Sequence, residues 1–327
     1  MFSKMPKKPE HLSDGSMTLF FIFGQGLFFL WKRGTKVTGY WAYRKSKHDF
    51  RRREEAKTKG QYAKRPKSLN EFHGYLFDLD GTVYSGDTLL PGVLSTLNRL
   101  REQNKSLLFV TNTTIRTVEE VRMRLEQLGV ACSESEIMTA SCAAGMYFQE
   151  YEPGARVLMI GEQAMKRELE RFDVETTEDA SGATHVLVGM DRQFTYDRLT
   201  QGMKALRNGA LLIAANPDPF CPLDDGAIPD TWSLVRALET ASLRQTFTVI
   251  GKPSAYYAEK VFQKLDIAPE ECLMVGDRIE TDIRFGNDHG MYSALVLTGA
   301  DSRKDIVLTG IEPDYVLASL RDILADW

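Results

Sequence analysis

The sequence is poor in cysteine and lacks the motifs on which several protein classes depend. Its four cysteines form no C-x-x-C pair and no zinc-ligand spacing, which argues against a disulfide framework and for a reducing compartment. Neither G-x-G-x-x-G nor G-x-x-x-x-G-K-[ST] occurs, so no nucleotide cofactor is indicated. The 12 prolines and 25 glycines among 327 residues are too few for a collagen-like or low-complexity chain. What remains is the composition of a globular protein with about two domains.

Long apolar runs are also missing. Residues 17–31 form an almost wholly apolar run of fifteen residues, short of the ~20 that a membrane-spanning helix needs. A basic stretch, residues 44–67, follows; residues 1–70 hold 17 Lys and Arg against 5 Asp and Glu, and the rest holds 24 against 40. Two interpretations are open: a poorly ordered extension or mis-assigned start, or weak association of residues 17–67 with an anionic membrane. Because no aromatic platform is interleaved with the basic run, we expect no nucleic-acid partner.

From residue 71 onward, buried strands alternate with amphipathic helices. The helical patterns include residues 88–104 and 118–130. Continuous apolar runs, each typical of a strand covered on both faces, occur at residues 73–78, 106–111, 156–161, 185–190, 210–216, 246–251, 272–277 and 292–299. Such alternation predicts βαβ units and therefore an α/β fold with a parallel sheet.

Two acidic clusters follow directly on buried strands. Asp78 ends the first run and Asp80 comes two residues later, while Asp277 ends the run 272–277 and Asp282 comes five residues later. Residues two apart in a strand share a face, and ligands of open α/β sheets bind beyond the carboxyl ends of the strands. Close carboxylates repel unless they hold a proton or a cation, and oxygen ligands favour magnesium. Each cluster taken alone also fits a solvated turn.

Polar side chains at two further strand ends could bind a phosphate. Thr111 and Asn112 follow one strand, and Lys252 follows another, so a hydroxyl, an amide and an ammonium are expected at the same edge. Each has an ordinary alternative, as a helix cap or a surface lysine. The combination favours the phosphate interpretation.

These motifs, in this order, resemble the haloacid dehalogenase superfamily of phosphatases. The resemblance rests on four motifs: DLDGT at 78–82, VTN at 110–112, GKP at 251–253 and GDRIETD at 276–282. The long interval before Lys252 is similar to the NagD-like branch, in which a cap domain is inserted there, and the nearest likeness is to its sugar-phosphate phosphatases. The resemblance covers about residues 71–325. It implies a Rossmann-like core, residues 71–153 and 246–327, with an inserted α/β cap, residues 154–245.

The resemblance also implies roles for individual residues. Asp78 would be the nucleophile and Asp80 the general acid and base, with Mg²⁺ held by Asp78, the Asp80 carbonyl and Asp277. Asp282 would support this site from the second layer, and Thr111, Asn112 and Lys252 would bind the phosphoryl group. The presence of Asp80 implies phosphoryl transfer rather than dehalogenation. Arg278 receives no role.

The cap offers weaker signals about the substrate. The resemblance places residues 191–194 towards the substrate, where Arg192 and Gln193 suit a hydroxyl-rich leaving group; both also fit an ordinary surface. A histidine stands at the position of Gln193 in pyridoxal-phosphate phosphatases, which makes pyridoxal phosphate a less favoured substrate. Asn216 and Asp218 either face the cleft or cap a turn.

Together these observations predict a cytoplasmic, Mg²⁺-dependent phosphatase of small phosphorylated metabolites, sugar phosphates first. One alternative is broad activity on nucleotides, phosphoglycolate or aryl phosphates. Another is a membrane-tethered, non-catalytic phosphate sensor. A homodimer through the cap is compatible with the resemblance, although no residue pattern demands it.

Overall fold

The structure is a computed structural model that describes residues 20–22, 27–29, 67–223 and 226–325. They divide into an N-terminal unit and a body that begins at Lys67. In the first unit, β1 (Phe20–Ile22) pairs antiparallel with β2 (Leu27–Phe29), while the basic residues 44–66 lie outside the described part. Of the helices described, none is both long enough and apolar enough to cross a membrane. Membrane association and a cytoplasmic location stay predictions.

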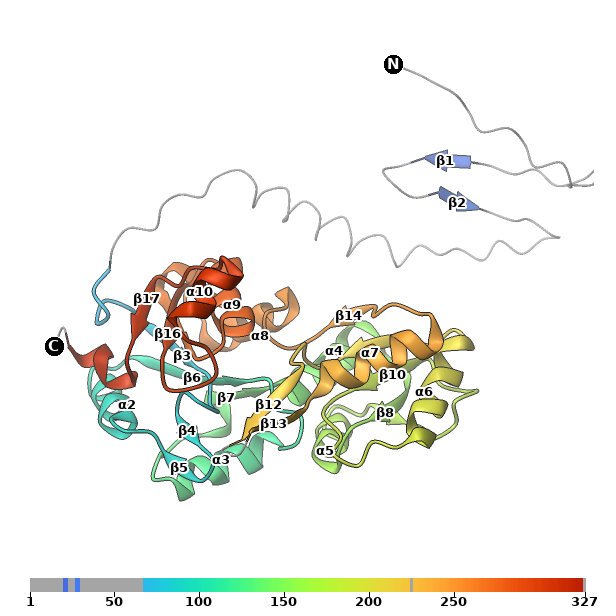
Figure 1. The fold of residues 1–327 in the computed structure, drawn as a ribbon, viewed down its shortest axis with the longest axis horizontal. Coiled ribbons are helices and arrows are strands. Elements are labelled where there is room, and N and C mark those ends of the chain that lie inside the picture. Colours follow the sequence, from blue (N-terminus) through green and yellow to red (C-terminus); the bar gives the residue numbers. More distant parts are fainter. Residues whose placement is uncertain (1–19, 23–26, 30–66, 224–225, 326–327) are drawn as a thin grey trace, which may run out of the picture. The chain divides into compact units, whose positions relative to one another are not determined.

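The core of the body is a six-stranded parallel sheet in the order β17-β16-β15-β3-β6-β7 (Figure 1). Its strands are β3 (Gly74–Phe77), β6 (Ser106–Thr111), β7 (Ile137–Thr139), β15 (Cys272–Gly276), β16 (Tyr292–Val296) and β17 (Tyr315–Leu317). Every residue of β3, β15 and β16 is buried, as expected for strands covered by helices on both faces. The predicted α/β fold with a Rossmann-like core is confirmed.

A second parallel sheet is inserted between β7 and β15 in the sequence. Its order is β14-β11-β10-β8-β9. The strands are β8 (Arg156–Ile160), β9 (Glu175–Thr176), β10 (His185–Val188), β11 (Leu211–Ala214) and β14 (Thr248–Val249). The cap boundary expected at residue 245 lies before β14, whose pairing with β11 joins Thr248–Val249 to the inserted sheet.

Helices and short hairpins complete the body. The α-helices are α2 (Val93–Glu102), α3 (Val118–Gln127), α4 (Ala140–Tyr151), α5 (Gln163–Glu170), α6 (Tyr196–Arg207), α7 (Thr231–Ser242), α8 (Ala255–Leu265), α9 (Arg284–Asp288) and α10 (Arg303–Thr309). The single turns are η1 (Glu134–Glu136), η2 (Pro269–Glu271), η4 (Leu320–Leu324) and the π-helical η3 (Ile279–Ile283). Two antiparallel hairpins are formed by β4 (Tyr84–Ser85) with β5 (Thr88–Leu89), and by β12 (Phe220–Leu223) with β13 (Gly226–Pro229).

Local sequence signals explain where the helices begin. At α3, the Thr117 hydroxyl accepts from the Glu120 amide while the Glu120 carboxylate accepts from the Thr117 amide, which is a complete capping box. At α8, the Ser254 hydroxyl accepts from the Tyr257 amide. Each helix is thus fixed immediately after a strand-end segment that carries predicted site residues.

The cap packs directly on the core. Met165 and Leu169 of α5 belong to the same buried apolar cluster as the core strands. Beside them, the fully buried Glu168 accepts from the Val118 amide of α3 at 2.7 Å.

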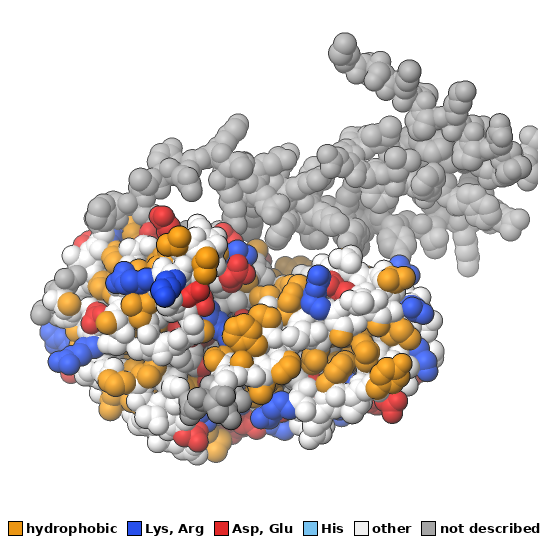
Figure 2. Space-filling model, viewed as in Figure 1, with side chains coloured by type: hydrophobic (Ala, Val, Ile, Leu, Met, Phe, Trp, Pro, Cys, Tyr) orange, Lys and Arg blue, Asp and Glu red, His pale blue; other side chains and the backbone are white. Residues whose placement is uncertain are grey.

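On the face drawn in Figure 2, acidic and basic side chains are interspersed, and apolar ones are more numerous over the inserted segment.

Candidate active site

Asp78, Asp277 and Asp282 meet at the carboxyl edge of the core sheet. Asp78 follows β3 directly, and Asp277 follows the neighbouring β15. One carboxylate oxygen from each of the three residues lies within 4.8 Å of the others. The parallel pairing of β3 with β15 therefore brings together two clusters that are about two hundred residues apart in the sequence.

Lys252 joins two of these carboxylates. Its ammonium lies 2.6 Å from Asp78 Oδ1 and 2.7 Å from Asp282 Oδ1, and it donates to the Val110 carbonyl at 2.8 Å. The side chain is 1% exposed. Burial alone would lower the pKa of Lys252, but the Asp282 and Asp78 charges outweigh it and hold the pKa above its ordinary value. The raised pKa favours the charged form of the lysine.

The same burial disfavours negative charge on the acidic groups. It raises the pKa of Asp78 well above its usual range, with Lys252 opposing the shift. It raises the pKa of Asp277 to about 7, and the neighbouring Asp282 adds to that rise. One positive lysine beside three carboxylates, of which Asp277 and Asp282 are buried and Asp78 is partly so, leaves an excess of negative charge, which a cation would offset.

The donor set also fits a hard divalent cation. Asp277 Oδ2 accepts from the Ala300 amide at 2.7 Å, whereas the buried Oδ1 of the same carboxylate has no hydrogen-bond partner. An unpartnered buried oxygen is costly unless it binds something. Gly81, with φ of 83°, makes the approach possible, because a Cβ there would lie 2.4 Å from Asp277 Oδ2. Oxygen ligands of this kind suit Mg²⁺ or Ca²⁺.

Asp282 has both carboxylate oxygens in use. Besides Lys252, it accepts from the Arg278 amide at 3.1 Å through Oδ2. These bonds orient the loop between β15 and η3. They are compatible with the supporting role expected of Asp282, which stays a prediction together with the part expected of the Asp80 carbonyl.

Thr111 ends β6 and Asn112 follows it; Asn112 is bonded to Lys252, although Lys252 follows β14 of the inserted sheet and not a strand of the core sheet. Thr111 is 4% exposed, and its hydroxyl oxygen accepts from the Thr113 amide at 3.1 Å, which leaves the hydroxyl proton available. The Asn112 amide is already occupied. Its Nδ2 donates to Asp218 Oδ2 at 2.9 Å and to the Lys252 carbonyl at 3.1 Å, and its Oδ1 accepts from the Lys252 amide at 2.8 Å. Phosphate binding by this side chain stays a prediction, because the structure gives it other partners.

Asp80 stands apart from the buried cluster. Its side chain is exposed, in the turn between β3 and the β4–β5 hairpin. The surrounding protein nevertheless raises the pKa of Asp80, and the positive charges of Arg116 and Arg124 partly offset this effect. A raised pKa favours the protonated carboxyl group that a general acid needs.

The cap residues expected near the substrate have partners of their own. The Arg192 guanidinium donates twice to Glu162, with both distances 2.7 Å, and thereby lowers the pKa of the Glu162 carboxyl. Gln193 is exposed, and its side chain has no hydrogen-bond partner among the described residues. Arg192 is therefore held within the cap, and of this pair Gln193 is the more available for a ligand.

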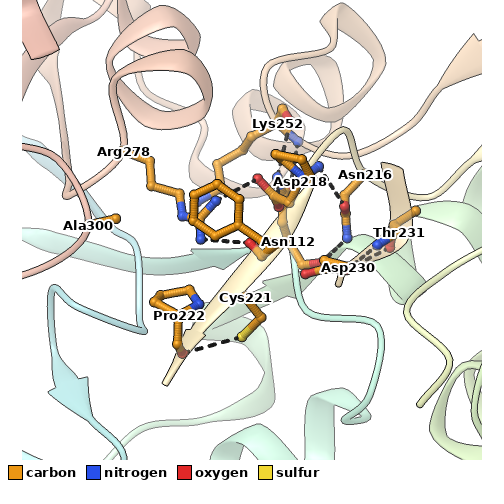
Figure 3. Close-up of polar contacts among 12 residues, drawn as sticks. Asn112, Asn216, Asp218, Cys221, Pro222, Asp230, Thr231, Lys252, Arg278 and Ala300 are labelled. Atoms are coloured by element: carbon orange, nitrogen blue, oxygen red, sulfur yellow. Dashed lines mark hydrogen bonds and ion pairs between the residues drawn. The ribbon is translucent and has the colours of Figure 1, made fainter. Parts of the chain in front are cut away.

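Two features of the site escape the sequence motifs (Figure 3). The β12–β13 hairpin reaches from the cap to the core, where Arg278 donates to the Phe220 carbonyl at 2.9 Å. Asp218, ambiguous in the sequence, is buried and contacts Asn112; burial raises its pKa to about 6, and the Arg278 charge opposes that rise. The Asp225-Gly226 dipeptide, typical of tight hairpins, was the available signal for β12–β13.

The fold and the site together define a class of protein. A parallel sheet, an inserted second sheet over its carboxyl edge and a carboxylate–lysine cluster at the strand ends form an enzyme site for an anionic substrate and a cation. Comparison with models of known protein families identifies the family within this class. A model described as haloacid dehalogenase-like hydrolase matches residues 75–175, and a second model for hydrolases of this kind matches residues 249–323.

Individual relatives agree with the family models. Chronophin of Mus musculus is 36% identical over 273 residues, which are 78% of this chain and 93% of the relative. Sugar-phosphatase AraL of Bacillus subtilis is 33% identical over 250 residues, covering 76% of this chain and 91% of the relative. The structure of a glycerol phosphate phosphatase from Mycobacterium tuberculosis in complex with magnesium has a TM-score of 0.72 and 33% identity, covering 79% of this chain and 78% of that one.

The chain belongs to the haloacid dehalogenase-like family of hydrolases. Within that family it is a NagD-like phosphatase, and its enzyme class is phosphoric monoester hydrolase.

Proposed function

We propose that the protein hydrolyses small phosphate monoesters, sugar phosphates first, through a phosphorylated Asp78 with Mg²⁺ as the metal. One observation carries this proposal: Asp78 stands at the end of β3 with Lys252 at 2.6 Å and the Asp277 and Asp282 carboxylates close by. A nucleophile, a fixed positive charge and a set of cation ligands thus occupy one sheet edge.

In the first step, a carboxylate oxygen of Asp78 attacks phosphorus, and the bond from phosphorus to the ester oxygen breaks. Asp80 gives its proton to that departing oxygen, so an alcohol leaves and Asp80 becomes a carboxylate. The raised pKa of Asp80 favours the protonated form that this step needs.

In the second step, water attacks the phosphorus of the aspartyl-phosphate while Asp80 takes a proton from it. The Asp78 carboxylate is released together with inorganic phosphate, and both residues return to their starting states. Lys252 and the Thr111 hydroxyl offset the charge on the phosphoryl oxygens. Asn112 organises this region through its bonds to Lys252.

Asp78 and Asp277 are the carboxylates that would hold Mg²⁺, joined by the Asp80 carbonyl. When bound, the cation offsets the charge of the substrate and of the acidic cluster. Asp282 positions Lys252, to which it is bonded.

A sugar phosphate is proposed as the preferred substrate for two reasons. The relative AraL is named a sugar-phosphatase. The exposed Gln193 on the cap can exchange hydrogen bonds with hydroxyl groups of a leaving sugar.

The test is phosphate release from a panel of sugar, glycerol, nucleotide and aryl phosphates, with Mg²⁺ and with EDTA. We expect turnover only with Mg²⁺, highest with a sugar phosphate. Asp78→Asn keeps the shape of the side chain but removes the nucleophile, so its turnover should fall by at least about 10³-fold. The exposed Asp197→Asn in α6 is the matched control and should behave as the unmodified protein.

Turnover in EDTA, or full activity of Asp78→Asn, would refute the mechanism. A preference for nucleotides or aryl phosphates would replace the proposed substrate and leave the mechanism intact. A folded protein that releases no phosphate from any ester would instead favour a phosphate sensor.

A further inference from the structure

Asp218 sits at the junction of cap and core with its carboxylate turned towards the core. It follows β11, and its side chain is 7% exposed. Oδ2 accepts from Asn112 at 2.9 Å, while Oδ1 lies 3.5 Å from Arg278 Nη1. A buried carboxylate is tolerated only where such partners offset its loss of hydration. Figure 3 shows Asn112 and Arg278 both approaching Asp218.

Arg278 extends the same connection to the β12–β13 hairpin. Its Nη2 donates to the Phe220 carbonyl at 2.9 Å, and its guanidinium lies over the Phe220 ring, 5.2 Å from the centroid. The planar, forked guanidinium holds the carboxylate and the carbonyl through separate nitrogens in a fixed geometry, whereas a lysine offers a single ammonium nitrogen. Arg278 also follows Asp277 in the sequence, and its own amide donates to Asp282 at 3.1 Å.

A single cluster of contacts therefore connects three parts of the site. Asn112 lies on the β6 side and is bonded to Lys252, Arg278 lies on the loop that carries Asp277 and Asp282, and Asp218 belongs to the inserted segment. The hairpin lies next to the loop that follows β15, because Arg278 donates to the Phe220 carbonyl at 2.9 Å and stacks over the Phe220 ring.

We propose that Asp218 and Arg278 form a clamp that positions the cap hairpin and the strand-end loops relative to each other. Both are positioning residues and touch neither the phosphate nor the cation. The clamp fixes the hairpin against the loop that carries Asp277 and Arg278, so correct placement of the leaving group depends on it. Its kinetic consequences rest on the proposed function; its structural consequence does not.

The test compares Asp218→Asn, Arg278→Gln and the double variant in the full chain. Asp218→Asn preserves shape and an acceptor for Asn112 but removes the charge that holds Arg278. The matched control is Glu134→Gln, which removes another cap–core ion pair, Arg171 to Glu134 at 3.5 Å, between two half-exposed side chains away from the site. Two quantities are measured for each variant: hydrogen exchange of residues 220–229, and kcat and KM for the best substrate of the panel.

We expect exchange in the hairpin to accelerate in both single variants and not in Glu134→Gln. We expect kcat to fall by on the order of tenfold to a hundredfold, because small misplacements of reacting groups have effects of that size. The double variant should resemble the single ones, since each alone opens the clamp. Arg278→Lys should fall between the unmodified protein and Arg278→Gln.

Additive losses in kcat/KM with unchanged hairpin exchange would mean that Arg278 contacts the substrate itself, and would overturn the clamp. Unchanged exchange together with unchanged kinetics would overturn it equally. Faster hairpin exchange in a protein without phosphatase activity would retain the clamp and refute the proposed function, so the two failures are distinguishable.

Discussion

At the scale of single residues, Lys252 decides the character of the site. Its ammonium is almost fully buried between Asp78 and Asp282, where it is the positive partner of two carboxylates. Removing one member of a buried ionic group leaves the others without compensation. In the proposed mechanism the same charge also offsets the phosphoryl oxygens, so stability and catalysis would both depend on the Lys252 ammonium.

We predict that Lys252→Met reduces both the stability of the protein and its turnover. In EDTA the free energy of unfolding should fall by about 3–5 kcal/mol, the range for one lost partner of a buried pair. With Mg²⁺, kcat should fall by at least about 10²-fold. Urea unfolding and steady-state kinetics measure the two effects.

Lys260→Met is the control, because Lys260 is also nearly buried but pairs with the half-exposed Glu150 on the core helices. It should lose about 1 kcal/mol and retain its turnover. Equal kinetic losses in both variants would mean that Lys252 acts only through stability.

Much at this scale follows from sequence, and the reason is local. Asp78, Thr111 and Asp277 each stand at the end of a core strand, and parallel strands end at one edge. Lys252 instead follows β14 of the inserted sheet, so its position beside Asp78 does not follow from that rule. The hydrogen-bond partners that cap residues give to the site cannot be predicted from the sequence. The bond from Asn112 to Asp218 and the pair of Arg192 with Glu162 join residues 106 and 30 positions apart, on elements whose docking no local pattern encodes.

At the scale of elements, α5 of the cap and α3 of the core share one buried carboxylate. Glu168 is fully buried on α5, accepts from the Val118 amide at the start of α3, and holds Arg171 at 3.1 Å. A carboxylate at a helix N-terminus satisfies an amide that otherwise has no partner and interacts favourably with the helix dipole. This contact of Glu168, called the α5–α3 joint below, helps to set the orientation of the cap on the core.

We predict that Glu168→Gln destabilises the body by about 2 kcal/mol, because a charged acceptor of buried hydrogen bonds is replaced by a neutral one. Glu170→Gln, on the exposed side of the same helix, should change stability by less than about 0.5 kcal/mol. Urea midpoints for the two variants decide the matter. Equal midpoints would show that the apolar contacts of α5 alone hold the joint.

Strands that coincide with long apolar runs can be predicted from the sequence, whereas short strands without such a run cannot. All the strands of the core sheet from 74 to 111 and from 272 to 296 coincide with apolar runs of the sequence. By contrast, the run 246–251 contributes only the two residues of β14, because the chain must leave the cap sheet there and return to the core. The described side chains of β12 and β13 are exposed or half-exposed, so these strands have no continuous apolar run that could predict them.

At the scale of the whole molecule, the charge of the chain divides at the same place as its structure. The basic excess of residues 1–70 precedes an acidic body, and the structural boundary falls at residue 66. Lys67 already belongs to the body, since its ammonium is 2.8 Å from Glu271 and 2.9 Å from the Glu270 carbonyl. Every residue assigned to the site lies between Asp78 and Asp282.

We therefore predict that a chain beginning at Lys67 keeps the catalytic properties of the full chain. Its kcat and KM should agree within about twofold, and its urea midpoint should not fall, because the buried core and the site remain whole. The comparison is made at low and at high salt, since a basic segment that steers anionic substrates would raise kcat/KM of the full chain only at low salt. A shorter chain with lower kcat at both salt concentrations would show that the first 66 residues complete the active site, and that the body is not the whole enzyme.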